Sequence, residues 1–486
     1  MRLSRFRFAD LDHRQWWAVF TVTCLVEGLI LGLQVMRRGV DADEGFYLMA
    51  GRQVLAGRRL YADFFFPQMP YLPYIQAAVL SVSDAPLVAG RLVSAVSGAI
   101  LAGLLAATAT RAMGKLRVGI AMAMVYAANA LVISIVPTAK TYGVANLALI
   151  AAFLLLARPQ ARAVGAFTAG VSAGIAVGAR LPAAAAVLVL LLWSSRGGIR
   201  NGVAFAAGVA LALVPCVWVA AQDPQNFWFC NFGFHMLRRE ISGLSPILLQ
   251  KGVVLAKWTL LPQNLILWAL ALVGIWLEPA AAPAIACAVA LSVVYLAATP
   301  TYLQYLTQIL PFLLLAGIPA LAVLLQHRKL TVAVASVYII GLLLALRTPP
   351  EGTVRGQKVQ FWRVGTVEEL ATYLHEHTER GDRILSWWEG YPLLARRSGF
   401  IGVGFWESNT AKKLPADARR RYHVLNQEDI RQLIASREPR LIVFPDGTWR
   451  RLENTIHEQY RQLARFGTTR VFERRDDYTV NVGKYG

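Results

Sequence analysis

The chain has 486 residues, of which 56% are hydrophobic and only 16% are charged, and its mean hydropathy is +0.46. Because about a quarter of the residues of a soluble domain are charged, this composition excludes an ordinary soluble enzyme and favours an integral membrane protein. The formal net charge of +20 fits cytoplasmic loops and lipid headgroups, so no nucleic-acid partner is implied.

Long apolar segments recur from the N-terminus to about residue 346, which is the transmembrane signature. The first is interpreted as a retained span, because no small-residue cleavage site follows it. Lysine and arginine gather in alternate loops, which places the N-terminus in the cytoplasm and, after an odd number of spans, the C-terminus outside. We predict eleven spans, near residues 16–36, 86–110, 118–136, 143–157, 163–179, 181–193, 201–221, 262–278, 284–298, 305–325 and 330–346.

The fold class predicted from these segments is an α-helical polytopic membrane protein, with a transmembrane domain over residues 1–346 and a small external α/β domain over residues 347–486. The transmembrane domain carries two external loops, 37–85 and 222–262. The second loop interleaves aromatic residues with arginine, which is typical of amphipathic helices in the headgroup layer. The α/β domain is predicted to contain helix 367–377, strand 383–388, helix 427–436, strand 440–444, helix 453–464 and a hairpin of 469–473 with 478–482.

The first external loop opens with three acids in four residues, Asp41, Asp43 and Glu44. Carboxylates are costly in hydrocarbon, so a group of them at the membrane surface indicates a functional site. The alternative is that they complement the dipole of a helix that begins here. That alternative explains one acid better than three. Asp43 is therefore the candidate catalytic base, with Glu44 as a second catalytic residue that positions the base or the acceptor.

The stretch DADEGFYLMAGRQVLAGRRLYADFFFPQMPYLPYIQAAVL, which starts at Asp41, resembles the C-type glycosyltransferases that use polyprenyl-phosphate sugars. This family 39-like group includes the protein O-mannosyltransferases and the lipid A aminoarabinose transferases. Such proteins have a cytoplasmic N-terminus, one span and a large external loop with an Asp or Asp-Glu motif. The resemblance covers about the first 350 residues. It rests on Asp43-Glu44 followed by Tyr47, Gly57, Tyr61, Asp63 and Pro70, and on the later Tyr302 and Tyr305.

The resemblance implies a glycosyltransferase of the bacterial inner membrane, which moves a hexosyl or pentosyl unit from a polyprenyl-phosphate donor to an external glycolipid, glycan or protein. Its product would modify lipopolysaccharide or another cell-envelope glycan. Many relatives have an acidic or polar residue where the fourth span begins, whereas this chain has Lys140, which leaves the sugar open. No cofactor or metal is expected, because no cluster of His, Asp and Glu has ligand spacing. Two other classes remain as alternatives: a flippase or transporter of lipid-linked sugars, and a non-catalytic subunit of a glycan assembly complex.

A departing sugar leaves a negatively charged phosphate, so the site needs cations at the depth of the acids. Lys140 and Arg180 interrupt apolar sequence on the external side, against the positive-inside bias, so we expect a phosphate as their counter-ion. Alternatively, the side chains of Lys140 and Arg180 could simply extend to the membrane interface, and the surface arginines could contact lipid headgroups. Arg91 could form an ion pair with Asp63 or Asp84, and His235 could make a structural hydrogen bond. The candidate substrate-binding residues are Arg58, Arg59, Tyr61, Asp63, Arg91, Lys140, Arg180, His235, Arg238, Tyr302 and Tyr305.

Overall fold

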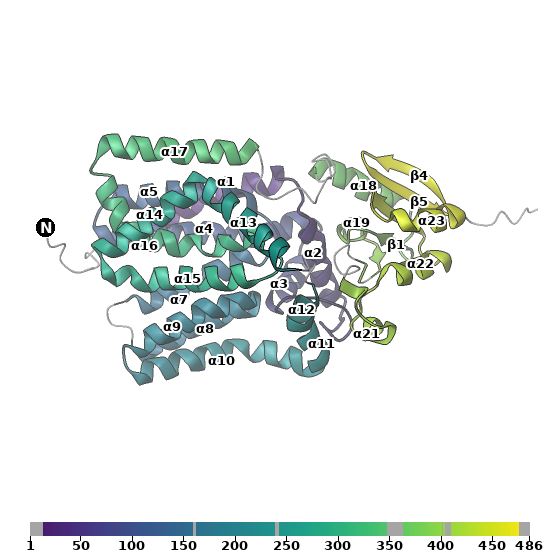
Figure 1. Cartoon of the computed structure of the whole chain (residues 1–486), viewed down its shortest axis with the longest axis horizontal. Helices are drawn as coiled ribbons and strands as arrows, with labels where there is room; N and C mark the ends of the chain where they lie inside the picture. The colour runs from purple at the N-terminus through teal and green to yellow at the C-terminus, as the bar shows by residue number, and fades with distance from the viewer. Residues whose placement is uncertain are drawn as a thin grey trace, which may run out of the picture.

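The computed structural model describes residues 13–158, 162–238, 243–347, 363–400, 402–403 and 410–475. It consists of a bundle of long helices and an α/β unit at one end of that bundle (Figure 1). The bundle helices are α1 (His13–Arg37), α4 (Pro86–Met113), α5 (Leu116–Ala127), α7 (Tyr142–Leu156), α8 (Ala163–Ala179), α9 (Ala184–Ser195), α10 (Ile199–Gln222), α14 (Pro262–Leu277), α15 (Ala282–Ala297), α16 (Leu310–Leu324) and α17 (Arg328–Arg347).

A helix lies at each predicted apolar segment, and segment 118–136 is divided between α5 and α6 (Ala130–Ile135). Within the described part of the chain, four helices are long and apolar enough to cross a membrane: α1, α4, α10, and α15 with the turn before it. The pair α13 (Leu244–Leu260) and α14, bent by 79°, would make a fifth span, while several other apolar helices have 10–17 residues. The multi-span helical class is thus supported, and the number of eleven crossings stays a prediction.

Shorter helices cover the end of the bundle that faces the α/β unit (Figure 1). Among them, α2 packs on α3 and α4 within the bundle and on α19 (Gly390–Leu394) of the α/β unit. The start of α2 therefore lies where the two parts of the molecule meet. The elements at this end are α2 (Ala42–Leu55), α3 (Tyr71–Leu80), α11 (Pro224–Trp228), the π-helical turn η2 (Phe229–Gly233), α12 (Phe234–Leu237) and the 3₁₀ helix η4 (Leu303–Gln308).

The α/β unit is built on a mixed five-stranded sheet of order β2-β1-β3-β5-β4. Strand β1 pairs in parallel with β2 and β3, and β5 pairs antiparallel with β3 and β4. The strands are β1 (Arg383–Ser386), β2 (Ser398–Gly399), β3 (Leu441–Pro445), β4 (Tyr460–Phe466) and β5 (Thr469–Arg474), and the helices include α18 (Val364–Glu376), α21 (Ala416–Arg421), α22 (Gln427–Ala435) and α23 (Glu453–Gln459).

The predicted helices 367–377 and 427–436 and strands 383–388 and 440–444 correspond to α18, α22, β1 and β3. The predicted helix 453–464 is wrong in its second half, because the chain leaves α23 at Gln459 and continues as β4. Pairing with β5 from Tyr460 to Phe466 supplies backbone hydrogen bonds that override the local helical pattern. The final hairpin is therefore β4 with β5; residues 478–482, its predicted second strand, lie outside the described residues.

The predicted orientation can be tested with reporter fusions. Helix α1 has 25 residues, about 38 Å at 1.5 Å per residue, and its last residues lead to α2, on which the α/β unit packs. Fusions at Arg117 and at Arg347 are expected to report opposite compartments, with the Arg347 fusion active only as an external reporter. A cytoplasmic signal at Arg347 would contradict the predicted external position of the α/β unit.

Candidate active site

The acidic cluster forms the beginning of α2. Asp41 is the N-cap of this helix, and its side chain accepts a hydrogen bond of 2.9 Å from the backbone N–H of Asp43. Glu44 completes a capping box, because its Oε2 accepts a hydrogen bond of 2.8 Å from the backbone N–H of Asp41. The helix-terminus interpretation therefore accounts for Asp41 and for part of the role of Glu44.

Glu44 also forms a buried ion pair with Arg91 of α4, and neither side chain is exposed. Arg91 Nε and Nη2 each donate to Glu44 at 2.8 Å, and the remaining donors of Arg91 reach the carbonyls of Val35, Arg38 and Gly39. A further hydrogen bond of 2.9 Å comes from the backbone N–H of Ala139. Because these groups fill both carboxylate oxygens, the geometry favours a positioning role for Glu44.

Arg91 does form an ion pair, as the alternative to substrate binding held, but the partner named there, Asp63 or Asp84, is wrong, since its acidic partner is Glu44. Asp63 instead pairs with Arg59 at 2.8 Å, and Asp84 pairs with Arg396 at 3.4 Å. The pair of Glu44 and Arg91 ties the ends of α1 and α4 to α2 and to the segment that leads to Lys140.

Lys140 lies between the two remaining acids of the cluster. Its Nζ is 2.9 Å from Asp41 Oδ1 and 3.0 Å from Asp43 Oδ2, and it donates a hydrogen bond to Gln304. Only 3% of the Lys140 side chain is exposed, whereas 19% of the Asp43 side chain is. The expectation that a phosphate, and not an acid of the first loop, is the counter-ion of Lys140 is thus wrong: Asp41 and Asp43 are its counter-ions, although they lie about a hundred residues away in the sequence.

The two acids that share Lys140 differ in their surroundings. Burial raises the pKa of Asp43, and the Asp41 carboxylate adds to this increase, although Lys140 and Arg238 oppose it. Burial also acts on Asp41, but the charges of Lys140 and Arg38 hold the pKa of Asp41 below its ordinary value. A carboxylate with a raised pKa takes up a proton more readily, which suits Asp43 for general-base catalysis.

This difference predicts the pH dependence of the reaction. Asp43 is a base only when deprotonated, so the rate should fall as the pH drops through a pKa above the ordinary value of about 3.9. In Asp41→Asn the helix keeps a good N-cap, but Asp43 loses a neighbouring negative charge. The acid limb of the rate–pH profile is then expected to move to lower pH. A limb that stays in place or moves upward would show that a group other than Asp43 titrates there.

Arg180 lies at the C-terminal end of α8 and is 4% exposed. Its Nε donates to the Tyr295 hydroxyl at 2.9 Å and its Nη1 donates to Thr141 Oγ1 at 3.1 Å. The guanidinium also lies over the rings of Tyr142, Tyr295 and Tyr305, at 4.3, 5.5 and 5.1 Å from their centroids. Among the described residues no carboxylate forms an ion pair with Arg180, so this buried cation is held by aromatic and hydroxyl groups alone.

Arg238, Tyr302 and Tyr305 extend the same site. Arg238 Nη2 donates to the Tyr302 hydroxyl at 3.0 Å, and the positive charge of Arg238 acts to lower the pKa of Asp43. The Tyr305 ring lies 5.4 Å from that of Tyr302 and 5.2 Å from that of Tyr295. A continuous row of tyrosines therefore runs from Arg238 to Arg180.

The other four predicted binding residues and His235 have different surroundings. Arg58 and Arg59 are exposed in the turn after α2, with Asp63 close to Arg59. Tyr61 is buried, has a φ of +67° and donates to the carbonyl of Gln68 at 2.6 Å. His235 contacts the carbonyl of Pro67 through Nε2 at 3.0 Å, and burial, helped by nearby arginines, lowers its pKa to about 4. It is thus neutral at physiological pH, in agreement with the structural alternative.

Four residues that belong to the site were not among the candidate catalytic or substrate-binding residues: Tyr47, which was named only as part of the motif, and Tyr142, Tyr295 and Gln304. Tyr47 is one helical turn after Asp43; burial raises its pKa, and the charges of Asp43, Arg180 and Lys140 all act on it. The spacing of four residues from Asp43 was the available signal, because residues i and i+4 share a helix face. Tyr295 and Gln304 gave no such signal, since only the packing of α15 and η4 brings them here.

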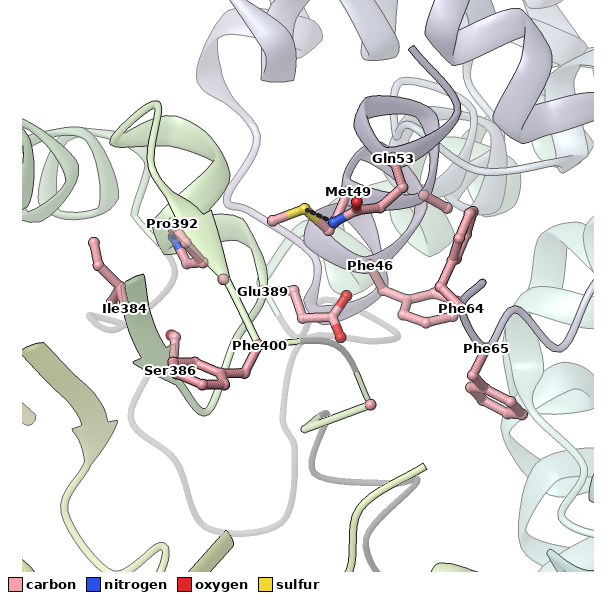
Figure 2. Close-up of a pocket in the computed structure, with 13 residues that line it drawn as sticks. Phe46, Met49, Gln53, Phe64, Phe65, Ile384, Ser386, Glu389, Pro392 and Phe400 are labelled. Carbon is pink, nitrogen blue, oxygen red and sulfur yellow. Dashed lines mark hydrogen bonds between the residues drawn. The ribbon is translucent and has the colours of Figure 1, made fainter. Parts of the chain in front are cut away.

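A pocket lies between α2 and the α/β unit (Figure 2). Phe46, Met49 and Gln53 of α2 line one side, and β1 and the segment after it line the other. Figure 2 shows the carboxylate of Glu389 projecting into the space between them. The described residues contain no group of three or more His, Cys, Asp or Glu side chains that could hold a metal; the expected metal independence stays a prediction.

Comparison with known proteins shows which fold this is. No protein-family model and no curated protein sequence matches the chain. Solved structures do match: that of ArnT from Cupriavidus metallidurans bound to undecaprenyl phosphate is similar over 95% of this chain and 98% of that chain, at 16% identity and a TM-score of 0.67. The apo structure of the same protein matches with a TM-score of 0.66, also at 16% identity, over 94% and 98% of the two chains. The resemblance drawn from the acidic motif is confirmed at the level of the fold.

Proposed function

We propose that this protein is an integral membrane glycosyltransferase, which transfers a sugar from a polyprenyl-phosphate donor to an acceptor on the external face of the membrane. The observation that carries the proposal is that one site contains both a candidate carboxylate base and a buried cation. Asp43 has a raised pKa and a partly exposed carboxylate, and Arg180 lies in the same tyrosine-lined site without a carboxylate partner among the described residues. The fold shared with ArnT, whose structure contains undecaprenyl phosphate, supports the same proposal.

The proposed reaction assigns each group a step. Asp43 takes the proton from the acceptor hydroxyl or amine as that atom forms its bond to the anomeric carbon of the sugar. The bond between the anomeric carbon and the phosphate oxygen breaks, and its electron pair leaves with the polyprenyl phosphate. Arg180 and Arg238 stabilise the negative charge on that phosphate. Lys140 neutralises Asp41 and holds Asp43 in place, a role that replaces the phosphate contact first expected of it.

Arg180 is suited to the phosphate because an unpaired buried cation costs free energy that an anion offsets. Gln308, whose Oε1 accepts a hydrogen bond from Tyr295, has an Nε2 group with no hydrogen-bond partner in the described part of the chain. The Arg180 side therefore offers a buried charge that no carboxylate of the described residues pairs with, together with a buried donor, and a phosphate binds both kinds of group.

Lipid analysis of a deletion strain tests the function. Cells that lack the protein are expected to accumulate a polyprenyl-phosphate sugar and to lose one sugar substituent from an envelope glycan, both detectable by mass spectrometry. Purified protein should then transfer the labelled sugar from the accumulated lipid to envelope material of the deletion strain. Normal lipid and glycan profiles in the deletion strain would contradict the proposal. So would a protein that moves the accumulated lipid across the membrane but transfers no sugar, because that is the behaviour of a flippase.

Donor binding gives a second test. Arg180→Met is expected to weaken binding of undecaprenyl phosphate about 10- to 100-fold, the scale of one hydrogen bond to a charged group. Arg200→Met is the matched control, because Arg200 is exposed at the first turn of α10, far from this site. Equal affinities of Arg180→Met and the parent, measured by titration in detergent micelles, would show that Arg180 is structural.

A further inference from the structure

The α/β unit touches the acidic motif itself. Trp388, which follows β1, donates an indole hydrogen bond of 2.9 Å to the carbonyl of Ala42. That carbonyl belongs to the peptide that joins Ala42 to Asp43, and the N–H of the same peptide donates to Asp41 at 2.9 Å. Both polar groups of the Ala42–Asp43 peptide are thus fixed by side chains: its carbonyl by Trp388 of the α/β unit and its N–H by Asp41 of the bundle.

Gly45 makes this contact possible. A Cβ atom built on Gly45 would lie 2.5 Å from the backbone nitrogen of Gly390 and 2.7 Å from two atoms of the Trp388 ring. A Cβ on Gly390 would in turn lie 2.2–2.5 Å from that ring. Two glycines therefore allow the first turn of α2 to approach α19 more closely than any side chain would permit, with the indole between them.

Trp388 is itself rigidly held. It is 3% exposed, its ring packs against Tyr391 at 4.9 Å, and its backbone N–H and carbonyl both contact the Ser386 hydroxyl. The core of the α/β unit also continues into the bundle, because Val40, Leu48 and Ala139 belong to the same buried cluster as Trp388. Ala139 precedes Lys140, so this cluster supports both partners of the ion pair between Asp43 and Lys140.

We infer that the α/β unit is a positioning element of the reaction, in which Trp388 and the close contact of Gly45 with Gly390 fix the Asp43 carboxylate relative to Lys140. This inference rests on the proposed function. It gives Trp388 no contact with substrate: the indole acts through the Ala42–Asp43 peptide. Loss of the indole N–H should release the first turn of α2 and admit water around Asp43, while the donor site at Arg180 stays intact.

The experiment compares Trp388→Phe with Trp387→Phe. Phenylalanine keeps an aromatic ring at position 388 but removes the N–H, and Trp387 is a buried neighbour whose backbone N–H donates to Val443 within the sheet. Trp388→Phe is expected to lower the rate of transfer from the deletion-strain donor about 10-fold and to leave the Kd for undecaprenyl phosphate within about 2-fold of the parent. The acid limb of its rate–pH profile should move to lower pH, because hydration removes the burial that raises the Asp43 pKa. Trp387→Phe should change neither rate nor profile.

A second pair of variants serves if Trp388→Phe folds poorly. Gly45→Ala inserts a methyl group into the contact, whereas Gly32→Ala inserts one in α1, where nothing lies within 4 Å of the added atom. Gly45→Ala should lower the rate and speed amide hydrogen exchange over residues 42–46, and Gly32→Ala should do neither. Parental rate, pH profile and exchange in both Trp388→Phe and Gly45→Ala would overturn the inference. Absence of transfer by the parent would instead overturn the proposed function, and the exchange measurement would still decide whether Trp388 holds α2.

Discussion

Asp43→Asn is expected to lower the rate of sugar transfer by a factor of about 100 or more, the usual scale of general-base catalysis. Asparagine has nearly the same shape as aspartate but cannot accept the acceptor's proton. The affinity for undecaprenyl phosphate should stay close to that of the parent, because the proposed phosphate contact is Arg180 and because Lys140 keeps Asp41 as a counter-ion. The measurement is single-turnover transfer of labelled sugar, together with a donor titration.

Asp84→Asn is the control for this substitution, because Asp84 belongs to the same predicted loop, 37–85, but is 94% exposed beside Arg396. It should behave as the parent does. Near-normal transfer by purified Asp43→Asn would refute the base assignment. If neither Asp43→Asn nor the parent transfers sugar but both bind the donor, the non-catalytic subunit becomes the better interpretation.

The second large effect is on stability. Arg91→Met should lower the free energy of unfolding by about 3–5 kcal/mol, because it leaves the Glu44 carboxylate buried without a charged partner. Arg59→Met removes an exposed arginine from a surface pair with Asp63 and should leave the free energy of unfolding almost unchanged, because water screens exposed ion pairs. Both values can be measured by unfolding the protein in mixed micelles with increasing amounts of a denaturing detergent.

The double variant Glu44→Gln with Arg91→Met separates charge burial from packing. It should be more stable than Arg91→Met alone, since no uncompensated charge remains. If Arg91→Met unfolds as the parent does, the ion pair contributes nothing to the fold, and the positioning role assigned to Glu44 fails with it.

The helical class, the position of the acidic motif and most elements of the α/β unit follow from sequence alone. Apolar segments of this length have few alternatives to helix, because the backbone in lipid must satisfy its own hydrogen bonds. Acids and cations at the ends of such segments or within them are rare enough to indicate function. On this ground Asp43, Lys140 and Arg180 could be selected from the sequence alone. Strand β4 was not predicted from the sequence, because its pairing with β5, and not its own hydrophobic pattern, decides its conformation.

Only the tertiary structure decided which charges meet. Glu44 pairs with Arg91 and Asp43 pairs with Lys140 across 47 and 97 positions of the chain, and no local pattern specifies partners at such distances. Burial then gives these neighbouring acids different surroundings: Glu44 is saturated by donors, Asp41 caps α2, and Asp43 has a raised pKa and a partly exposed side chain. The sequence by itself thus determined which chemical types occur in the segment of the acidic motif. The packing of α2 against α4, the Lys140 segment and the α/β unit determined which acid has a raised pKa, because charge pairing and desolvation depend on distances that only the folded chain defines.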